Sequence, residues 1–589
     1  QSSWSFLPSH LASDTRNDVR AESTVPDPQL FGDILEALRV MQDSYFQPWV
    51  GTWPTAIDWT AAVMGTHVAA ALTSISEGLG LIHPLGSEEY SIKENVVSLY
   101  FTQLIGFYFG QDAFAIRLQA FDDMLWVVLN WLDAIQFIDA FSKSRDSNLA
   151  AAASQLTDPT EILRNQSWHG NLWIPAFAHR ARLFWELAST GWDTKLCGGG
   201  MTWNPRLMPY KNAITNELYI AGSIGMYIYF PGDDNAAPFN VTLDPEPPRP
   251  QEVWHPHDPK YFTAAVDAYA WLTSSNMTNS QGLYVDGFHI SGYPSGSNNT
   301  KCDQRDEMVY TYNQGVLLSG QLNLFRVTGD AAFLRAGHVL VQNVIRATGY
   351  NLGHQSPVDD VDALFPGQLP PWHGLGRAGI LEDACDVGGQ CSQNAQTFKG
   401  IWMHHFAVFC SLLEPPPADL PFVTAAPSFD AIRAAHFAAC QRYVPWLGHN
   451  ARAARGTRDG AGKYGMWWTV GLLNLTESGL QITPAALPPP TPGTIDYRNY
   501  GVPNDPVWVA TDVPLPPLEM GSAASPLKAG DEVWGQRPMA NLVKRGRSSG
   551  GKEKRDTYPD PNTRGRGRTV ETQGTGLAAL RAFWEVSNQ

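Results

Sequence analysis

Helical periodicity dominates this chain from Asp58 onward, and the alternation typical of strands is scarce. The stretches DWTAAVMGTHVAAALTSISE and ENVVSLYFTQLIGFYFG each predict one helix. Asp123 to Ala140 predicts a third, because its apolar residues recur at steps of three and four. Further helices are predicted near 173–190, 211–228, 260–275, 314–328, 330–347, 395–413, 428–443, 465–480 and 572–586. The chain is therefore expected to be all-α.

Several of the predicted helices open with a polar and aromatic cluster that ends at or near a small residue. These clusters are YKNAITNE from Tyr210, YTYNQG from Tyr310, QTFKG from Gln396 and VETQG from Val570. Each cluster taken alone is consistent with an ordinary helix N-cap. Together they suggest repeated helical hairpins, because a closed ring of hairpins brings the same end of every inner helix to one mouth.

Prolines gather in the predicted loops at 231–259, 350–380, 413–427 and especially 482–538. We predict that residues 1–57 form an N-terminal extension that packs on a helical barrel. The barrel is expected to cover residues 58–589, with a long insertion at about 482–568.

Composition excludes several classes of function. Of the 589 residues, 43% are hydrophobic and 17% are charged, which indicates a globular protein. A formal net charge of −16 argues against nucleic acid and anionic membranes as main partners. No run of about 18 apolar residues appears, so no membrane span is expected. A zinc site is not expected, since no C-x-x-C element is paired with a second one. We also expect a monomer that needs no cofactor.

Two features point to a secreted, extracellular protein, which could be associated with a cell wall. Five N-x-S/T patterns are candidate N-glycosylation sites, at Asn165, Asn240, Asn276, Asn298 and Asn474. Six cysteines, an even count, fit a set of disulfides. Cys385 and Cys391 bracket the turn-like stretch DVGGQ and are the best local pair.

The stretch AFDDMLWVVLNWLDAI places Asp122 and Asp123 side by side at the start of an apolar helix. One interpretation is a helix N-terminus, where negative charge is worth about 0.3–1 kcal/mol. A metal-diphosphate site is less consistent, because residue 126 is Trp where such a site would have a third Asp. A pair of catalytic carboxylates explains both residues: close carboxyls push their pKa values apart, so one keeps its proton while the other is ionised. Neighbouring residues can also place their carboxyls at the about 5–5.5 Å separation that retaining glycosidases use.

Sugar recognition is suggested by residues around this pair. The chain contains 21 Trp, 20 Tyr and 26 Phe, and aromatic rings beside Asp and Asn suit sugar rings. Asn212 and Asn216 lie on one face of the helix after Tyr210 and need hydrogen-bond partners that a polyhydroxylated ligand would supply. We expect six residues to face one cavity with the aspartate pair: Trp126, Asn212, Asn216, Asp286, Tyr312 and Gln314.

Several longer motifs strongly resemble the fungal branch of glycoside hydrolase family 76: FDDMLWVVLNWLDAI, YKNAITNELY, GLYVDGF, YTYNQGVLLSG, FKGIWMHHF and VETQGTGLAALRA. The resemblance implies an (α/α)6 barrel with Pro-rich loop insertions and an α-1,6-mannanase activity. It also implies that Asp122 is the nucleophile and Asp123 the acid/base, and that Asp286 lies in the sugar pocket. The stretch 482–558 is longer than the family pattern.

The expected function is hydrolysis of α-1,6-mannan backbones with retention and by endo action, on mannan or mannoprotein glycans. Two alternatives stay open. One is a cell-wall transglycosylase acting on mannose-containing anchor glycans, although the chain ends in FWEVSNQ rather than a hydrophobic anchor signal. The other is a noncatalytic mannan-binding protein, against which the intact aspartate pair speaks.

Overall fold

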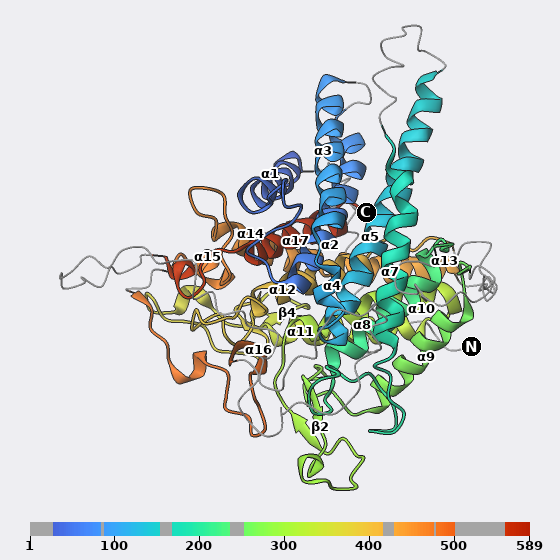
Figure 1. Cartoon of the computed structure of the whole chain (residues 1–589). Coiled ribbons are helices and arrows are strands. Elements are labelled where there is room, and N and C mark those ends of the chain that lie inside the picture. Colours follow the sequence, from blue (N-terminus) through green and yellow to red (C-terminus); the bar gives the residue numbers. More distant parts are fainter. Residues whose placement is uncertain are drawn as a thin grey trace, which may run out of the picture.

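The structure is a computed structural model that describes residues 27–83, 87–153, 168–235, 253–415, 429–475, 479–500 and 560–589. Helices dominate these ranges, and the strands are short (Figure 1). The all-α class predicted from the periodicity is confirmed.

Six helices of the described ranges form a closed inner ring. Each packs on the next, and the last, α17, packs on the first, α2. Their bounds are α2 Asp58–Ile82, α5 Phe121–Ala153, α8 Ala213–Tyr229, α10 Val316–Thr328, α12 Ala395–Phe409 and α17 Val570–Ser587.

An outer layer of helices covers this ring. α3 packs on α2, α7 on α5, α9 on α8 and α11 on α10, while both α14 and α1 pack on α17. The outer bounds are α1 Pro28–Tyr45, α3 Glu88–Gly110, α7 Ile174–Ser189, α9 Pro259–Ser274, α11 Ala332–Ala347, α13 Phe429–Gln441 and α14 Val444–Gly456. The inner-then-outer order of successive helices is that of an (α/α)6 barrel, as the family resemblance implied.

The composition of each helix explains its layer. The inner helices α8 and α17 are buried on nearly all sides, whereas the outer helix α1 buries one side through residues such as Leu30, Ile34 and Met41. Small residues let inner helices approach closely: a Cβ on Gly400 of α12 would lie 2.8 Å from the Cα of Thr575 on α17. The segment Phe121–Arg145 of α5 is long and apolar enough for a membrane span, but 72% of its most apolar window is buried inside the protein, which identifies a core helix.

Short elements form the loops between the helices. Strands β1 (Lys211–Asn212), β2 (Gly287–His289) and β3 (Gln304–Asp306) make an antiparallel sheet in that order. Two further strand pairs are β4 (Tyr350–Asn351) with β5 (Ser356–Pro357), and β6 (Gly376–Arg377) with β7 (Ile380–Leu381). The remaining helical turns are α4 Ala113–Ile116, η2 Gly170–Trp173, η3 Tyr293–Ser295, η4 Tyr312–Gln314, η5 Val361–Ala363, α15 Trp468–Leu473, η7 Pro484–Ala486, α16 Tyr497–Tyr500 and η9 Pro561–Thr563.

The N-terminal ends of inner helices meet at one mouth of the barrel. Glu571, in the first turn of α17, accepts hydrogen bonds at Oε1 from Thr60 of α2 and from Gln393 beside α12, both at 2.8 Å. The clusters starting at Tyr210, Tyr310, Gln396 and Val570 all stand at the starts of inner helices. The polar clusters seen in the sequence therefore belong to one end of the ring.

Two helix predictions were wrong in detail. The prediction near 465–480 shrinks to α15, Trp468–Leu473, because Asn474 takes a left-handed conformation (φ 50°) that ends the helix. Helix α14 was not predicted, because its sequence VPWLGHNARAARG is rich in polar, charged and small residues. Of the insertion predicted at about 482–568, residues 501–559 lie outside the described ranges.

All six cysteines are paired, as Cys197–Cys302, Cys385–Cys391 and Cys410–Cys440. The local pair predicted from the sequence is therefore present. Asn276, Asn298 and Asn474 are exposed, and Asn165 and Asn240 lie outside the described residues.

Candidate active site

The two adjacent aspartates occupy the first turn of α5, at the mouth of the barrel. Asp123 accepts a hydrogen bond at Oδ2 from the backbone N–H of Ala120, 3.2 Å away, and so caps its own helix. Asp122 accepts at Oδ1 from the backbone N–H of Asp123 (3.1 Å) and at Oδ2 from the indole Nε1–H of Trp203 (3.1 Å). The helix-start interpretation thus holds for Asp123, while Asp122 is held by the side chain of a separate loop.

Burial raises the pKa values of both aspartates, but by different amounts. It raises the pKa of Asp122 to about 6, against the lowering effect of the Arg498 guanidinium and of its hydrogen bonds. Burial also raises the pKa of Asp123, well above its usual range, and the neighbouring charge of Asp122 adds to this effect. Asp122 therefore loses its proton first, and Asp123 keeps its own to higher pH.

Asp286 is a third buried carboxylate, placed where the loop after α9 enters strand β2. Its Oδ2 accepts a hydrogen bond from the hydroxyl of Tyr210 at 2.7 Å, and its Oδ1 accepts from Nδ2 of Asn313 at 3.4 Å. Asp306 on β3 lies beside it, and burial together with the charge of Asp286 raises the pKa of Asp306 to about 8. The three-stranded sheet thus brings a second acidic pair to the mouth.

A positively charged side chain, that of Arg498, lies beside these carboxylates. It belongs to the segment 479–500, which we term the strap. Arg498 of α16 has Nη2 4.0 Å from Oδ1 of Asp286, and its guanidinium carbon lies 4.9 Å from the centre of the Trp203 ring. Its side chain is 13% exposed. Asp122, Asp123, Trp203, Asp286 and Arg498 together are termed the mouth cluster.

Aromatic side chains border the mouth cluster. The ring of Tyr312 stacks on Phe398 at 3.8 Å, and burial raises the pKa of the Tyr312 hydroxyl, which interacts electrostatically with Arg498, Asp286 and Asp122. Trp126, one turn along α5 from the aspartates, stacks on Trp59 at 5.7 Å. Of the residues predicted to share one cavity, Asp286 and Tyr312 thus lie at the mouth cluster, and Trp126 lies on its helix.

Asn216 and Gln314 both make hydrogen bonds to the backbone. Asn216 accepts from the backbone N–H of Met201 (2.7 Å) and donates to the carbonyls of Met201 and Asn212. Gln314 accepts from the N–H of Tyr284 (2.8 Å) and donates to the carbonyls of Tyr284 and Tyr310. Backbone groups thus bind both amides and hold the neighbouring loops in place, and the role of these two residues as sugar ligands stays a prediction.

Asn212 differs from these two amides. It is fully buried beside Asp286, since Asn212 pairs with Gly287 in the sheet. Within the described part of the chain, neither polar atom of its amide has a hydrogen-bond partner. The same holds for both carboxyl oxygens of Glu217, whose pKa burial raises. Unpaired buried groups of this kind leave hydrogen-bonding capacity beneath the mouth.

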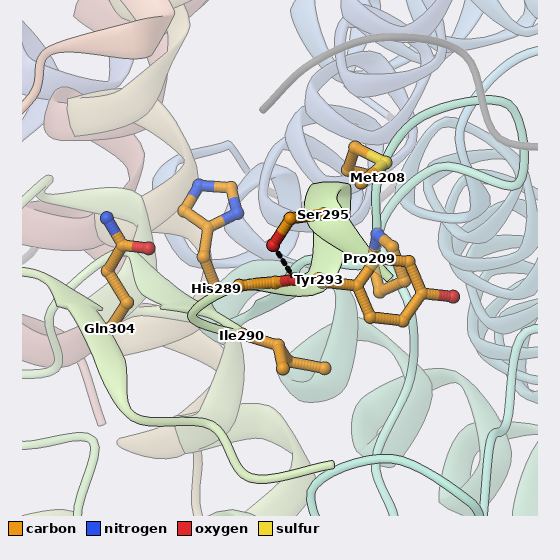
Figure 2. A pocket seen from close by; sticks show the side chains of 8 residues that line it. Met208, Pro209, His289, Ile290, Tyr293, Ser295 and Gln304 are labelled. Atoms are coloured by element: carbon orange, nitrogen blue, oxygen red, sulfur yellow. Dashed lines mark hydrogen bonds between the residues drawn. The ribbon is translucent and has the colours of Figure 1, made fainter. Parts of the chain in front are cut away.

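A cavity of about 290 Å³ lies next to the mouth cluster. Figure 2 shows His289 and Gln304 on one side of it, and Met208, Pro209 and Tyr293 on the other. The His289 ring stacks on Tyr210 at 4.3 Å, and the Tyr210 hydroxyl binds Asp286. The cavity is thus joined to the mouth cluster through one tyrosine.

Two groups of residues have the spacing of metal ligands, but each includes disulfide cysteines. They are His338 with His436 and Cys440, and Cys385 with Asp386 and Cys391. Because Cys440 is bonded to Cys410, and Cys385 to Cys391, neither group offers a thiolate. These groups carry no argument for a metal centre.

Sequence reasoning missed Trp203, Tyr210 as an acid partner, Asp306 and Arg498. The signal for Tyr210 was present, since it opens the polar cluster YKNAITNE. Arg498 gave no such signal: the run TPGTIDYRNY reads as part of a Pro-rich loop, and its contacts lie far away in the sequence.

Comparisons with known proteins give a consistent result. Residues 255–421 match the family described as Glycosyl hydrolase family 76. A mannan endo-1,6-α-mannosidase, DCW1 of Candida glabrata, is 24% identical over 184 residues, which cover 29% of this chain and 34% of that protein. The match thus spans about a third of the length of this curated relative.

Two solved structures are similar at low sequence identity. One is an inactive variant of the α-1,6-mannanase GH76A of Salegentibacter sp. HEL1_6 in complex with α-1,6-mannotriose, at 16% identity and a TM-score of 0.41, covering 74% of this chain and 92% of that chain. The other is Dfg5 from Chaetomium thermophilum in complex with glucosamine, at 14% identity and a TM-score of 0.44, covering 76% and 85%.

Proposed function

We propose that this chain is a secreted glycoside hydrolase that cleaves α-1,6-mannosidic bonds within mannan backbones, because residues 255–421 match glycosyl hydrolase family 76 and the chain is similar to a mannan endo-1,6-α-mannosidase. The observation that carries this proposal is the adjacent, buried pair Asp122 and Asp123, whose pKa values are held apart at the mouth of the barrel. Glycoside hydrolysis needs one ionised and one protonated carboxyl at the same bond.

In the proposed reaction, Asp122 attacks the anomeric carbon and forms a covalent mannosyl ester. Asp123 donates its proton to the leaving oxygen, which is the 6-oxygen of the next mannose. Asp123, now ionised, then takes a proton from water, and that water displaces Asp122 from the sugar. Two displacements at one carbon give a product with retained α configuration.

Features around the pair support recognition of a sugar chain. Trp203 and Tyr312 present aromatic rings beside the carboxylates, and Asp286 and Asn212 offer polar groups. The cavity lined by His289 and Tyr293 is large enough for a further sugar of the backbone, which favours an endo-acting enzyme.

Secretion is supported by chemistry of the chain rather than by its site. Three disulfides form and persist in oxidising compartments. The exposed Asn276, Asn298 and Asn474 are accessible to N-glycosylation. Removal of N-glycans should lower the mass of protein secreted from a eukaryotic host, and an unchanged mass together with six free thiols would contradict this part of the proposal.

Product analysis on unbranched α-1,6-mannan tests the proposed function. We expect oligosaccharides of several lengths early in the reaction, whose new reducing ends appear first as the α anomer by proton NMR. Elongated products in place of reducing ends would indicate transglycosylation. Binding without any product would leave a noncatalytic mannan-binding protein, and a β anomer would exclude the adjacent pair as nucleophile and acid/base.

A further inference from the structure

The strap is anchored across the mouth at several points before it reaches Arg498. The backbone N–H of Ile495 donates to Oδ1 of Asp306 at 3.0 Å, and the carbonyl of Gly493 accepts from the N–H of Glu307 at 3.1 Å. The hydroxyl of Tyr310 donates to Oδ1 of Asp496 at 2.7 Å. The strap therefore adheres to the loops that carry the acidic residues.

Ser392, just before α12, fixes the end of the strap. Its hydroxyl donates to the carbonyl of Arg498 at 2.6 Å, and its N–H donates to Oδ1 of Asn499 at 2.7 Å. The backbone N–H of Arg498 is 3.3 Å from the Tyr310 hydroxyl. Both backbone groups of Arg498 are thus satisfied, and the residue's position is set independently of its side chain.

The guanidinium itself is not satisfied. Its Nε and Nη2 atoms are buried, and within the described ranges neither has a hydrogen-bond partner. The nearest carboxylate oxygen recorded for it, Oδ1 of Asp286, lies 4.0 Å from Nη2, beyond hydrogen-bond distance. The guanidinium carbon lies 4.9 Å from the centre of the Trp203 ring, within the range of a cation–π contact, and the same indole holds Asp122.

A buried cation with unpaired donors costs free energy, about 1–3 kcal/mol for each donor left without a partner. That cost disappears when a ligand accepts from those donors. The oxygens of a sugar are suitable acceptors, and the sugar attacked by Asp122 would lie directly beside the fork.

We propose that Arg498 is a substrate-binding residue of this site, whose Nε–H and Nη2–H donate to oxygens of the mannosyl residue attacked by Asp122. This inference rests on the proposed mannanase function and extends it to the strap. The charge of Arg498 has a second effect, because it opposes the influence of burial on Asp122 and favours the ionised nucleophile.

Two substitutions separate these roles. Arg498→Met removes the donors and the charge, and we expect kcat/KM on α-1,6-mannan oligosaccharides to fall about 10–100-fold, the loss of a charge-assisted hydrogen bond. The acidic limb of the kcat/KM profile should also move to higher pH, since Asp122 then binds its proton more tightly. Arg498→Lys keeps the charge but not the planar fork, so it should restore the acidic limb while KM remains high.

Arg305→Met is the matched control. Arg305 stands on the same acidic sheet, but its guanidinium donates to the carbonyls of Asn276 and Thr278 and pairs with Glu307 at 2.9 Å. We expect no shift of the acidic limb in this variant. The melting temperature of each variant would be recorded, so that a loss of folded protein is separated from a loss of binding.

The outcomes distinguish this inference from the function on which it rests. An active wild type with an Arg498→Met variant of equal KM and unchanged pH profile would overturn the role of Arg498 and leave the mannanase standing. A wild type that neither cleaves nor binds α-1,6-mannan would overturn both. Monodeoxy mannosides would then identify the contact: the hydroxyl bound by Arg498 is the one whose removal costs the wild type more than Arg498→Met.

Discussion

Two buried arginines differ in their side-chain partners: Arg377 binds the strap from outside it, whereas Arg498 belongs to the strap. Arg377 of β6 donates from Nε to Oε2 of Glu382 at 2.9 Å and from Nη1 to the carbonyl of Ala486 in the strap at 2.6 Å, while its Nη2 has no hydrogen-bond partner in the described ranges. Glu382 is in turn bound by Trp467 and Thr469. Arg498, at the other end of the strap, contacts no carboxylate within hydrogen-bond distance in the described ranges.

The difference separates stability from function. A buried ion pair whose hydrogen bonds are made fixes local structure, and its value is lost when one partner is removed. A buried cation with unpaired donors contributes little to stability, and its donors are available to bind a ligand. The first belongs to the fold and the second to the site, although sequence alone presents both as an Arg in a loop.

The largest expected effect comes from Asp122. Asp122→Ala should lower kcat on α-1,6-mannan by about 10⁴-fold or more, because no covalent intermediate can form. The melting temperature should not fall, since a buried carboxylate is removed. Glu382→Gln, which changes the partner of Arg377, is the control outside the mouth cluster: it should lower the melting temperature and keep the activity of the folded fraction. An equal loss of activity in both variants would contradict the assignment of Asp122 to catalysis and of Glu382 to stability.

Asp123 should show an effect that depends on the leaving group. Asp123→Ala should slow cleavage of natural mannan by about 10²–10⁴-fold, because the departing sugar oxygen needs a proton. An aryl mannoside with a good leaving group should keep part of its first-step rate. Added azide should then give a mannosyl azide of α configuration, detected by NMR, whereas a β product would contradict the assigned roles.

The two arginines should differ most in stability. Arg377→Met leaves Glu382 buried without its partner, a change that costs about 3–5 kcal/mol. Arg498→Met breaks no side-chain hydrogen bond within the described ranges, so its melting temperature should stay closer to that of the wild type. Thermal unfolding of both variants measures the difference, and a larger loss for Arg498→Met would show that this arginine also serves the fold.

The pH dependence follows from the raised pKa values of the pair. kcat/KM should fall as the pH drops below about 6, because Asp122 becomes protonated there, and should fall again at higher pH when Asp123 loses its proton.

The stability of the fold depends on pH in its own way: raised carboxyl pKa values mean that the folded state holds protons that the unfolded chain releases near the ordinary value of 3.8. The pair therefore destabilises the fold increasingly as the pH rises through these values. Replacing both aspartates with Asn should raise the melting temperature more at neutral pH than at pH 4. A gain in melting temperature that is the same at both pH values would argue against raised pKa values for the pair.

The smallest expected effect lies in the cavity beside the mouth cluster. Tyr293→Ala should raise KM for long α-1,6-mannan oligosaccharides by a few fold and leave KM for the shortest cleaved substrate unchanged, because Tyr293 lines the cavity and not the aspartate pair. KM measured against chain length tests this. An equal change for all lengths would place the cavity outside the path of the substrate.

Local patterns predicted the parts of this molecule that local physics determines. The apolar stripe from Leu125 to Ile135 gave α5, and the adjacency of Asp122 and Asp123 gave the candidate catalytic pair. Residue type alone did not predict which groups each side chain binds. Asn216 and Gln314 look like sugar ligands in the sequence, but both bind backbone groups of distant loops. Arg498 could not be identified from its neighbours in the sequence, because Trp203 and Asp286 lie near it only in the folded structure.

The closed ring also sets an order of events during synthesis. Helix α17 fills the place between α12 and α2, and α1, made first among the described helices, packs on this last-made helix. Until residues 570–587 leave the ribosome, the first and fifth inner helices expose apolar flanks with nothing to cover them. Because exposed apolar surface promotes aggregation, we expect a truncation that removes α17 to yield aggregate rather than a smaller barrel.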